Sequence, residues 1–364
     1  MKVKKLAQVI CSLFLSFLIL NAICFFYYNV PVHSESESGS TDYVWEKSKF
    51  YSKGTEGFAW GKTDANGFNN LTVENSISPE ILIMGSSHTE AFNVAQNENY
   101  VYLLNELMSK SGMGWSSYNI GVSGHTITTC LSNFKNAVEE FKPGKYVVME
   151  VSSTELTAEE INSLFDGTVN EIHSSANPIV IFLQKIPFVR CAYYQLDKMG
   201  IGAKNTNNNV PKPQAAKADV SVQQSTSDLL EEYKSALNLV LKETGSVAQK
   251  NGIKLMFLYN PDLKINKNGE VIPQTQSEKS EIFMSACRDN GIEFLNMYDA
   301  YAENYSKTCR LPHGFSNTAV GKGHLNKFGH ELIANELYEF ILKLEQQNVI
   351  EAKEEKWFFQ ALNF

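Results

Sequence analysis

The stretch Ile81-Leu-Ile-Met-Gly-Ser-Ser-His-Thr-Glu90 joins a short apolar run to a polar turn. Four apolar residues end at Gly85 and small polar residues follow, which is the pattern of a buried strand that ends in a loop. In open α/β sheets, ligands bind just beyond the carboxyl ends of the strands. The stretch therefore predicts Ser86, Ser87 and His88 at the binding edge of a sheet. An ordinary turn with an N-capping serine is the alternative interpretation.

A second informative stretch, Gly323-His-Leu-Asn-Lys-Phe-Gly-His330, precedes an amphipathic helix near the end of the chain. The apolar residues on one face of that helix are Ile333, Leu337, Phe340, Ile341 and Leu344. His324 lies in the loop before the helix, where a side chain can reach a site, whereas His330 falls in or beside the first turn. Serine needs a base to act as a nucleophile near neutral pH, so Ser87 with His324 is a more specific signal than either residue alone.

The chain begins Met-Lys-Val-Lys-Lys, and residues 6–28 contain no charge. As a helix these residues would extend roughly 34 Å, enough to cross the hydrocarbon core of a bilayer. The run ends in Phe-Phe-Tyr-Tyr, typical of an interfacial aromatic belt, and no small-residue cleavage signature follows it. We therefore expect an uncleaved single-pass anchor, with a cleaved signal peptide as the alternative. The lysines before the run predict that the rest of the chain is outside the cytoplasm.

The length and composition favour one enlarged domain. We expect residues 1–30 to form a cytoplasmic stub and transmembrane anchor, residues 31–44 a linker, and residues 45–364 the domain. The 364-residue chain has a net charge of −8 and shows no basic footprint for nucleic acid. Its cysteines have no CxxC or His-rich spacing, so we expect no zinc site, while disulfides stay open.

Strand-like and helix-like segments alternate along this domain. Beyond residues 81–85, we expect strands over residues 117–120, 145–151, 254–259 and 292–297, and helices over residues 100–111, 227–249 and 277–289, with another that ends at Phe141. The alternation predicts a parallel sheet with helices on both faces. Residues 43–79 have no such pattern, and we expect an irregular lead-in at the domain edge.

An insertion over about residues 163–225 interrupts the alternation. Residues 177–196 are apolar and aromatic, whereas residues 205–224 are polar and rich in Pro, Ala and Ser. Extra packing followed by a mobile loop is one interpretation, and a lid or membrane-facing element is the other. Deletion of residues 205–224 is expected to leave the fold nearly intact, because such segments bury little apolar surface.

The loop sequences resemble the blocks of the SGNH/GDSL hydrolases over most of residues 80–345. Gly85-Ser-Ser87 stands where that family has Gly-Asp-Ser, which makes Ser87 the nucleophile. Asn119-Ile-Gly-Val-Ser-Gly124 matches the second block and gives Gly124 the oxyanion position. His324-Leu-Asn-Lys-Phe-Gly-His330 matches the last block, with His324 as the base. The resemblance implies a flavodoxin-like three-layer α/β/α fold.

Two departures from the family pattern concern the remaining site residues. The third block usually ends in Gly-x-Asn-Asp, and here Thr154 takes the place of the Asn. The implied oxyanion hole is therefore formed by Ser87, Gly124 and Thr154, with Ser153 or a backbone N–H as a substitute for the threonine. The family's Asp three residues before the catalytic His is Gly321 in this chain.

Without that Asp, we expect His324 and Ser87 to work as a dyad in which a backbone carbonyl holds His324 Nδ1. The alternative is a carboxylate from elsewhere in the chain, with Asp262, Glu90 and Glu155 as candidates. Asp262 follows the fourth strand.

The resemblance implies a serine esterase that acts through an acyl-enzyme on Ser87 and needs no cofactor. Because the domain is expected to lie outside the cytoplasm on a membrane anchor, its expected substrates are O-acyl groups, above all O-acetyl groups, of cell-envelope glycans. Two alternatives stay open: a glycan O-acetyltransferase, and a catalytically weak protein that binds envelope glycans.

Overall fold

The computed structural model describes residues 2–31, 33–34, 44–71, 78–167, 169, 183, 185–199 and 226–362. A parallel five-stranded sheet with the strand order β10-β9-β8-β6-β7 lies at its centre. Counted along the chain, this order is 2-1-3-4-5, the flavodoxin-like arrangement, so the predicted fold class is confirmed. The strands are β6 (Ile81–Met84), β7 (Ser117–Asn119), β8 (Tyr146–Val151), β9 (Lys254–Tyr259) and β10 (Glu293–Asn296).

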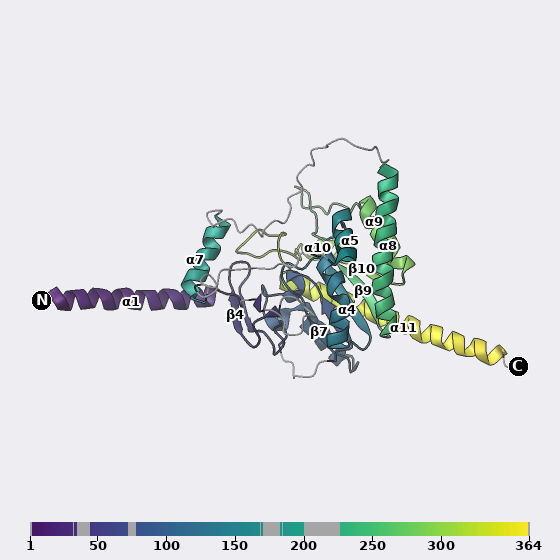
Figure 1. Ribbon diagram of the computed structural model, residues 1–364, viewed down its shortest axis with the longest axis horizontal. Helices are drawn as coiled ribbons and strands as arrows, with labels where there is room; N and C mark the ends of the chain where they lie inside the picture. The colour runs from purple at the N-terminus through teal and green to yellow at the C-terminus, as the bar shows by residue number, and fades with distance from the viewer. Residues whose placement is uncertain are drawn as a thin grey trace.

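Helices cover both faces of this sheet and form its two cores (Figure 1). One face packs against α4 (Ile127–Phe141), α5 (Ala158–Asp166), α8 (Thr226–Lys250) and α9 (Glu278–Asp289). The other face packs against α3 (Tyr100–Lys110), α10 (Tyr298–Thr308) and α11 (Lys327–Leu362). Every residue of β6 and β8 is buried as a result, which explains why these strands are continuous apolar runs rather than alternating ones.

The core elements expected from the sequence are present, most with bounds that agree to within one residue. The last helix begins at Lys327, which leaves His324 in the loop before it, as expected. The sequence analysis did not anticipate α5, α10 or the one-turn helix α2 (Ser87–Glu90). A short 3-10 helix, η1 (Gln96–Glu98), precedes α3.

The lead-in to the domain contains regular structure, so the expectation of an irregular segment is wrong. Strands β1 (Tyr28–Asn29), β4 (Phe50–Lys53) and β5 (Ala59–Lys62) form an antiparallel sheet, and β2 (His33–Ser34) pairs with β3 (Val44–Trp45). Strands this short give no sustained alternation that a sequence pattern could reveal. Tyr51 of β4 packs on Phe92, which attaches the small sheet of β1, β4 and β5 to the main domain, and Trp45 of β3 packs on the same ring.

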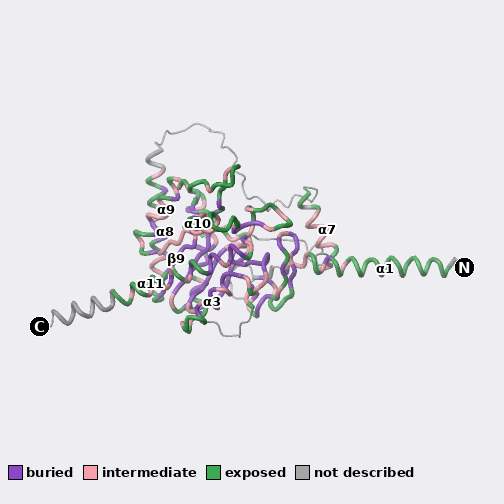
Figure 2. Tube along the Cα trace, turned by 180° about the vertical axis from the view of Figure 1, so that it is seen from behind, coloured by how far each residue is buried: buried purple, intermediate pink, exposed green. Residues whose placement is uncertain are grey.

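The helix α1 (Lys2–Tyr27) is long and apolar enough to cross a membrane, a test that a signal sequence near an N-terminus would also pass. Figure 2 shows it projecting from the buried body with its surface exposed. Its last turn is joined to the small sheet, because Gly54 N donates to Tyr27 O at 2.7 Å and Ser52 Oγ donates to Phe25 O at 2.5 Å. The chain then enters β1 directly, with Tyr28 opposite Lys53.

This connection predicts that residues just after α1 stabilise the domain. A chain that begins at residue 28 keeps β1, whereas a chain that begins at residue 42 loses it and leaves the β4 edge unpaired. We expect the shorter chain to unfold with a free energy lower by about 1–3 kcal/mol, the order of one or two net hydrogen bonds. Urea unfolding of both soluble chains measures the difference, and equal stabilities would contradict a structural role for β1.

The insertion contributes α7 (Pro187–Lys198), which packs against α1. Residues 205–224 lie outside the described residues, so the expected tolerance to their deletion stays a prediction. The division of the chain into anchor, linker and domain also stays a prediction.

Candidate active site

The nucleophile block lies at the carboxyl edge of the sheet, where β6 ends. Ser86 caps α2, its Oγ accepting from His88 N at 3.4 Å, and Ser87 is the first residue of the helix. A side chain at Gly85 would collide with Thr89 and with the Glu150 carboxylate, so only glycine fits between the strand and the turn. Ser87 is partly exposed at this edge, which is the predicted place for the nucleophile.

Glu150 supports this block from β8. Its buried carboxylate accepts from Ser86 N at 3.1 Å, from Ser86 Oγ at 3.0 Å and from Thr89 Oγ1 at 3.2 Å. Three donors compensate for removing the carboxylate from water and fix the start of α2. The sequence analysis did not single out Glu150, although an acidic residue within a buried apolar strand is a visible signal.

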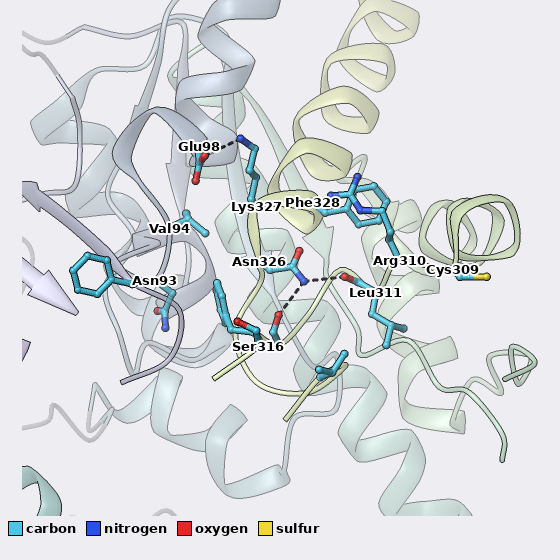
Figure 3. Close-up of a pocket in the computed structure, with 14 residues that line it drawn as sticks. Asn93, Val94, Glu98, Cys309, Arg310, Leu311, Ser316, Asn326, Lys327 and Phe328 are labelled. Carbon is cyan, nitrogen blue, oxygen red and sulfur yellow. Dashed lines mark hydrogen bonds and ion pairs between the residues drawn. The ribbon is translucent and has the colours of Figure 1, made fainter. Parts of the chain in front are cut away.

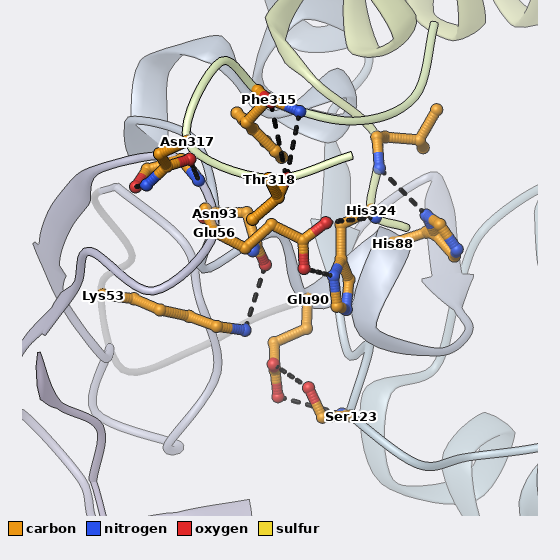
Figure 4. Close-up of polar contacts among 12 residues, drawn as sticks. Lys53, Glu56, His88, Glu90, Asn93, Ser123, Phe315, Asn317, Thr318 and His324 are labelled. Carbon is orange, nitrogen blue, oxygen red and sulfur yellow. Dashed lines mark hydrogen bonds and ion pairs between the residues drawn. The ribbon is translucent and has the colours of Figure 1, made fainter. Parts of the chain in front are cut away.

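The other half of the candidate site is His324, which is paired with Glu56. His324 Nδ1 lies 2.5 Å from Glu56 Oε2, and His324 N donates to Glu56 Oε1 at 2.8 Å (Figure 4). Glu56 thus holds both the ring and the backbone of His324. The expectation that a backbone carbonyl holds Nδ1 is wrong, because a carboxylate occupies that position.

The turn that carries Glu56 is fastened to the histidine loop. Asn317 donates to Gly54 O at 3.1 Å and to Gly57 O at 3.0 Å, and Gly57 N donates back to its Oδ1 at 2.9 Å. Asn93 Nδ2 donates to Glu56 O at 2.9 Å from the segment that follows α2. The Glu56 side chain is therefore placed by contacts to both blocks of the site.

The charge on Glu56 is favoured by its surroundings. Burial raises the pKa of Glu56, but hydrogen bonds from the side chain and backbone of His324, with the nearby Lys53 ammonium, more than offset this and hold the pKa below its ordinary value. An ionised Glu56 can fix the His324 tautomer with the proton on Nδ1, leaving Nε2 as the basic nitrogen.

The alternative carboxylates do not take this position. Among the described residues, Asp262 and Glu155 make no hydrogen bond to His324, and Glu90 is fully buried with other partners. The Gly321 backbone has a φ of +81°, and a Cβ there would lie 3.0 Å from Leu311, so the usual Asp position is unfavourable for a side chain.

The two blocks meet through His88, the residue after Ser87. Its ring centre lies 5.5 Å from that of His324, and Leu325 N donates to His88 Nδ1 at 3.2 Å. Within the described part of the chain, no hydrogen bond joins the side chains of Ser87 and His324. The structure therefore brings the predicted nucleophile and base to the same edge, and their direct contact stays a prediction.

The loop after β7 provides the predicted oxyanion position. Gly124 has a φ of +89°, a conformation that favours glycine. Ser123 fastens this loop to α2, because its N donates to Glu90 Oε1 at 2.9 Å and its hydroxyl donates to Glu90 Oε2. In the described structure, the N–H groups of Ser87 and Gly124 have no acceptor, so both are available to a ligand.

Thr154 is engaged elsewhere. It is buried, and its Oγ1 lies 2.8 Å from Ser280 Oγ on α9. This contact gives no support to its predicted role as an oxyanion donor. The contribution of the carboxyl end of β8 to the site is Glu150, which holds Ser86 at the start of α2.

A pocket of about 530 Å³ opens beside the histidine loop (Figure 3). Asn326 helps to shape it, donating to Leu311 O at 2.8 Å and Gly314 O at 3.0 Å. An ion pair between Lys327 Nζ and Glu98, at 2.8 Å, closes one side. Neither Ser87 nor His324 lines this pocket, so it adjoins the candidate site without containing it.

His330 has a structural role and does not lie at the candidate site. It is buried beneath α3, where its Nδ1 accepts from Tyr100 N at 3.3 Å. Burial, with the nearby His88, His313 and His324, lowers the pKa of His330 to about 3. This ring therefore stays neutral at neutral pH and supports the choice of His324 as the base.

The low pKa of His330 predicts how stability changes with pH. Below about pH 6.5 His330 is protonated in the unfolded chain but stays neutral in the folded chain. The free energy of unfolding should therefore fall as pH falls, and His330 alone should contribute up to about 1.4 kcal/mol per pH unit. The variant His330→Asn keeps an acceptor for Tyr100 N and should reduce that slope. Urea unfolding between about pH 4 and pH 6 measures it, and an unchanged slope would contradict a neutral buried His330.

No protein-family model matches the chain, and no curated protein sequence matches it. Solved structures similar to it include the psychrotrophic esterase EstA from Pseudoalteromonas sp., with 17% identity over 73% of this chain and 98% of its own and a TM-score of 0.37. An acetyl xylan esterase from Geobacillus stearothermophilus has 15% identity, covers 72% and 94% of the two chains and gives a TM-score of 0.36. A member of the lipolytic G-D-S-L family from Veillonella parvula has 10% identity, covers 71% and 96%, and gives a TM-score of 0.34.

The chain resembles the SGNH/GDSL hydrolases. The resemblance rests on its sequence blocks together with their places in the fold: Ser87 after β6, Gly124 after β7 and His324 before the last helix. The acid at His324 is one place where this chain departs from the SGNH/GDSL pattern, because Glu56 comes from the lead-in and not from the last block. Thr154, in place of the usual Asn, is the other.

Proposed function

We propose that the protein is a serine esterase in which Ser87 is the nucleophile and His324 the general base. The observation that carries this proposal is the bond between His324 Nδ1 and Glu56 Oε2. A carboxylate at Nδ1 orients the imidazole and stabilises the imidazolium that forms when Nε2 takes a proton from serine. His324 is half-buried, and a histidine with only a structural role would not require a charged partner at such a position.

The proposed reaction has two steps. Ser87 Oγ attacks the acyl carbonyl as His324 Nε2 takes its proton, and the N–H groups of Ser87 and Gly124 donate to the oxyanion. His324 then returns the proton to the leaving alcohol, and an acyl-enzyme remains on Ser87. Water activated by His324 attacks this ester, which releases the acid and restores the serine.

We propose O-acyl groups, above all O-acetyl groups, on cell-envelope glycans as the substrates. Ser87 and His324 are both partly exposed, which suits an acyl group presented on a polymer better than an enclosed small molecule. The proposed position outside the cytoplasm rests on the lysines before α1. The hydrogen bonds from Gly54 and Ser52 to the last turn of α1 support its retention, since cleavage after it would break them.

Transfer of the acyl group to a sugar is the second candidate reaction. The pocket beside the histidine loop favours it, because Gly314, Phe315 and Asn326 of that loop line the pocket and would hold an acceptor next to the candidate site. The same acyl-enzyme serves both reactions, and the competing acceptor decides the product. A catalytically weak glycan-binding protein is disfavoured by the paired Glu56 and His324.

The proposal is tested by labelling the full chain in detergent micelles with a serine-directed phosphonate. We expect one modified serine, Ser87, and a parallel loss of hydrolysis of a chromogenic acetyl ester. The variant Ser152→Ala, which removes an exposed serine directly after β8, is the matched control and should be labelled as the wild type is. Labelling of another serine, or hydrolysis that survives complete labelling of Ser87, would contradict the mechanism.

A further inference from the structure

The insertion helix α7 packs on the C-terminal part of α1, although the two are far apart in sequence (Figure 1). The rings of Phe17 and Phe188 lie 6.4 Å apart, edge to face. Those of Tyr28 and Tyr194 lie 4.5 Å apart. Because residues 6–28 form the proposed membrane anchor, the surroundings of α1 along this contact are lipid rather than water.

The contact between α1 and α7 includes a polar side chain whose hydrogen bonds are made to protein and need no water. Asn21, a polar residue within the apolar α1, donates from Nδ2 to Phe17 O at 2.9 Å and accepts from Phe188 N at 3.2 Å. The first N–H groups of a helix lack partners within that helix. In hydrocarbon such groups must be satisfied by protein. The Asn21 side chain provides the acceptor for Phe188 N at the start of α7, and Phe188 N provides a donor for the Asn21 oxygen.

The outer side of α7 is apolar and unusually exposed. Leu196 on α7 and Met199, one residue past its end, are 45% and 67% exposed, and Phe188 keeps 36% of its surface exposed beside its contact with Phe17. Leu196 follows Phe188 by eight residues, which places both on the same side of the helix. Arg190 points the other way, with Nη1 donating at 2.7 Å both to Asn29 Oδ1 and to Val30 O. The helix is thus held to the domain by its polar side and presents its apolar side outward.

Aromatic side chains continue this surface around the end of α1. Phe50 on β4 stacks on Phe25 with ring centres 5.3 Å apart and is 38% exposed. Trp60 on β5 is 59% exposed. Aromatic rings gathered at the end of a membrane span are typical of the headgroup level.

We propose that α7 is a second membrane-contacting helix: its first turn, with Phe188, enters the bilayer beside Phe17, and its other end places Leu196 and the adjacent Met199 in the bilayer surface. Phe17 is ten residues before the end of α1, or about 15 Å along its axis, so the first turn of α7 dips below the headgroups while the rest lies near the interface. The exposed Lys198 at its end suits anionic headgroups. The inference rests on the proposed anchorage of α1. It implies that the candidate active site is held close to the membrane.

Tryptophan quenching tests this inference with the full chain in vesicles of phosphatidylcholine and phosphatidylglycerol. The phosphatidylcholine carries bromine near the glycerol end of its acyl chains, so it quenches only tryptophan at the bilayer surface. Three single variants are compared with the wild type. Leu196→Trp reports on α7. Ile23→Trp reports on the end of α1 near the bilayer surface, because Ile23 is 60% exposed and lies four residues before the helix ends. Leu239→Trp on α8 is the matched control, because Leu239 is 48% exposed on the body of the domain.

We expect the added emission of Leu196→Trp to be quenched about as strongly as that of Ile23→Trp and to shift to shorter wavelength, while Leu239→Trp stays unquenched. Quenching of Ile23→Trp alone would overturn the inference and leave the anchor intact. Absence of quenching in Ile23→Trp would overturn the anchorage and the inference with it. Met199→Trp, one residue beyond α7, replaces Leu196→Trp if that variant does not fold.

Discussion

Replacement of Glu56 by glutamine is expected to lower kcat/KM for an acetyl ester by about three to four orders of magnitude, the effect of neutralising the acid of a catalytic triad. The amide of glutamine matches the carboxylate in size but removes the negative charge. It also favours the wrong tautomer of His324, because an amide N–H facing Nδ1 needs that nitrogen as an acceptor. Hydrolysis of a chromogenic acetyl ester by the full chain in detergent micelles measures the loss, and thermal unfolding checks the fold.

Two matched variants separate this role from a general effect of charge. Glu155→Gln and Asp262→Asn neutralise carboxylates near the same edge that make no hydrogen bond to His324 in the described structure, and each should stay within a fewfold of the wild type. The partner assignment would be wrong if either control lost a thousandfold while Glu56→Gln kept its rate. It would also be wrong if Glu56→Gln lost activity only in proportion to the protein that unfolds.

The fold was predictable because its signals are local. Strands such as β6 and β8 are covered on both faces and therefore read as short apolar runs, and the helices between them carry their own periodic faces. The small sheet of β1, β4 and β5 was missed because its strands have two to four residues. Its stability comes from packing on Phe92 and on the end of α1, which are contacts between distant segments.

The sequence predicted only those residues of the candidate site that lie within a recognisable sequence block. Ser87, Gly124 and His324 each follow or precede a core element, so their blocks place them at one edge. Glu56 lies 268 residues before His324, in a turn between two short strands, and no spacing rule joins the two. A search limited to acids near the histidine or after the core strands could not find it.

Replacement of Ser87 by alanine is expected to lower kcat/KM by about six orders of magnitude, the scale of removing the nucleophile of a serine hydrolase. The change deletes only a partly exposed hydroxyl that makes no hydrogen bond in the described structure, so the fold should be unaffected. Ester hydrolysis by Ser87→Ala and by the control Ser152→Ala measures the effect. Activity of Ser87→Ala within tenfold of the wild type would exclude an acyl-enzyme at this residue.

The double variant Ser87→Ala with Glu56→Gln tests whether the two residues belong to one catalytic unit. Glu56 acts through His324, and the base has no proton to remove once the serine hydroxyl is absent. The loss in the double variant should therefore match that of Ser87→Ala alone, because members of a triad are strongly non-additive. Losses that multiply to their full product would mean that Glu56 contributes to a step independent of the nucleophile. In that case the bond between Glu56 and His324 would serve to hold the loop, not to orient a base.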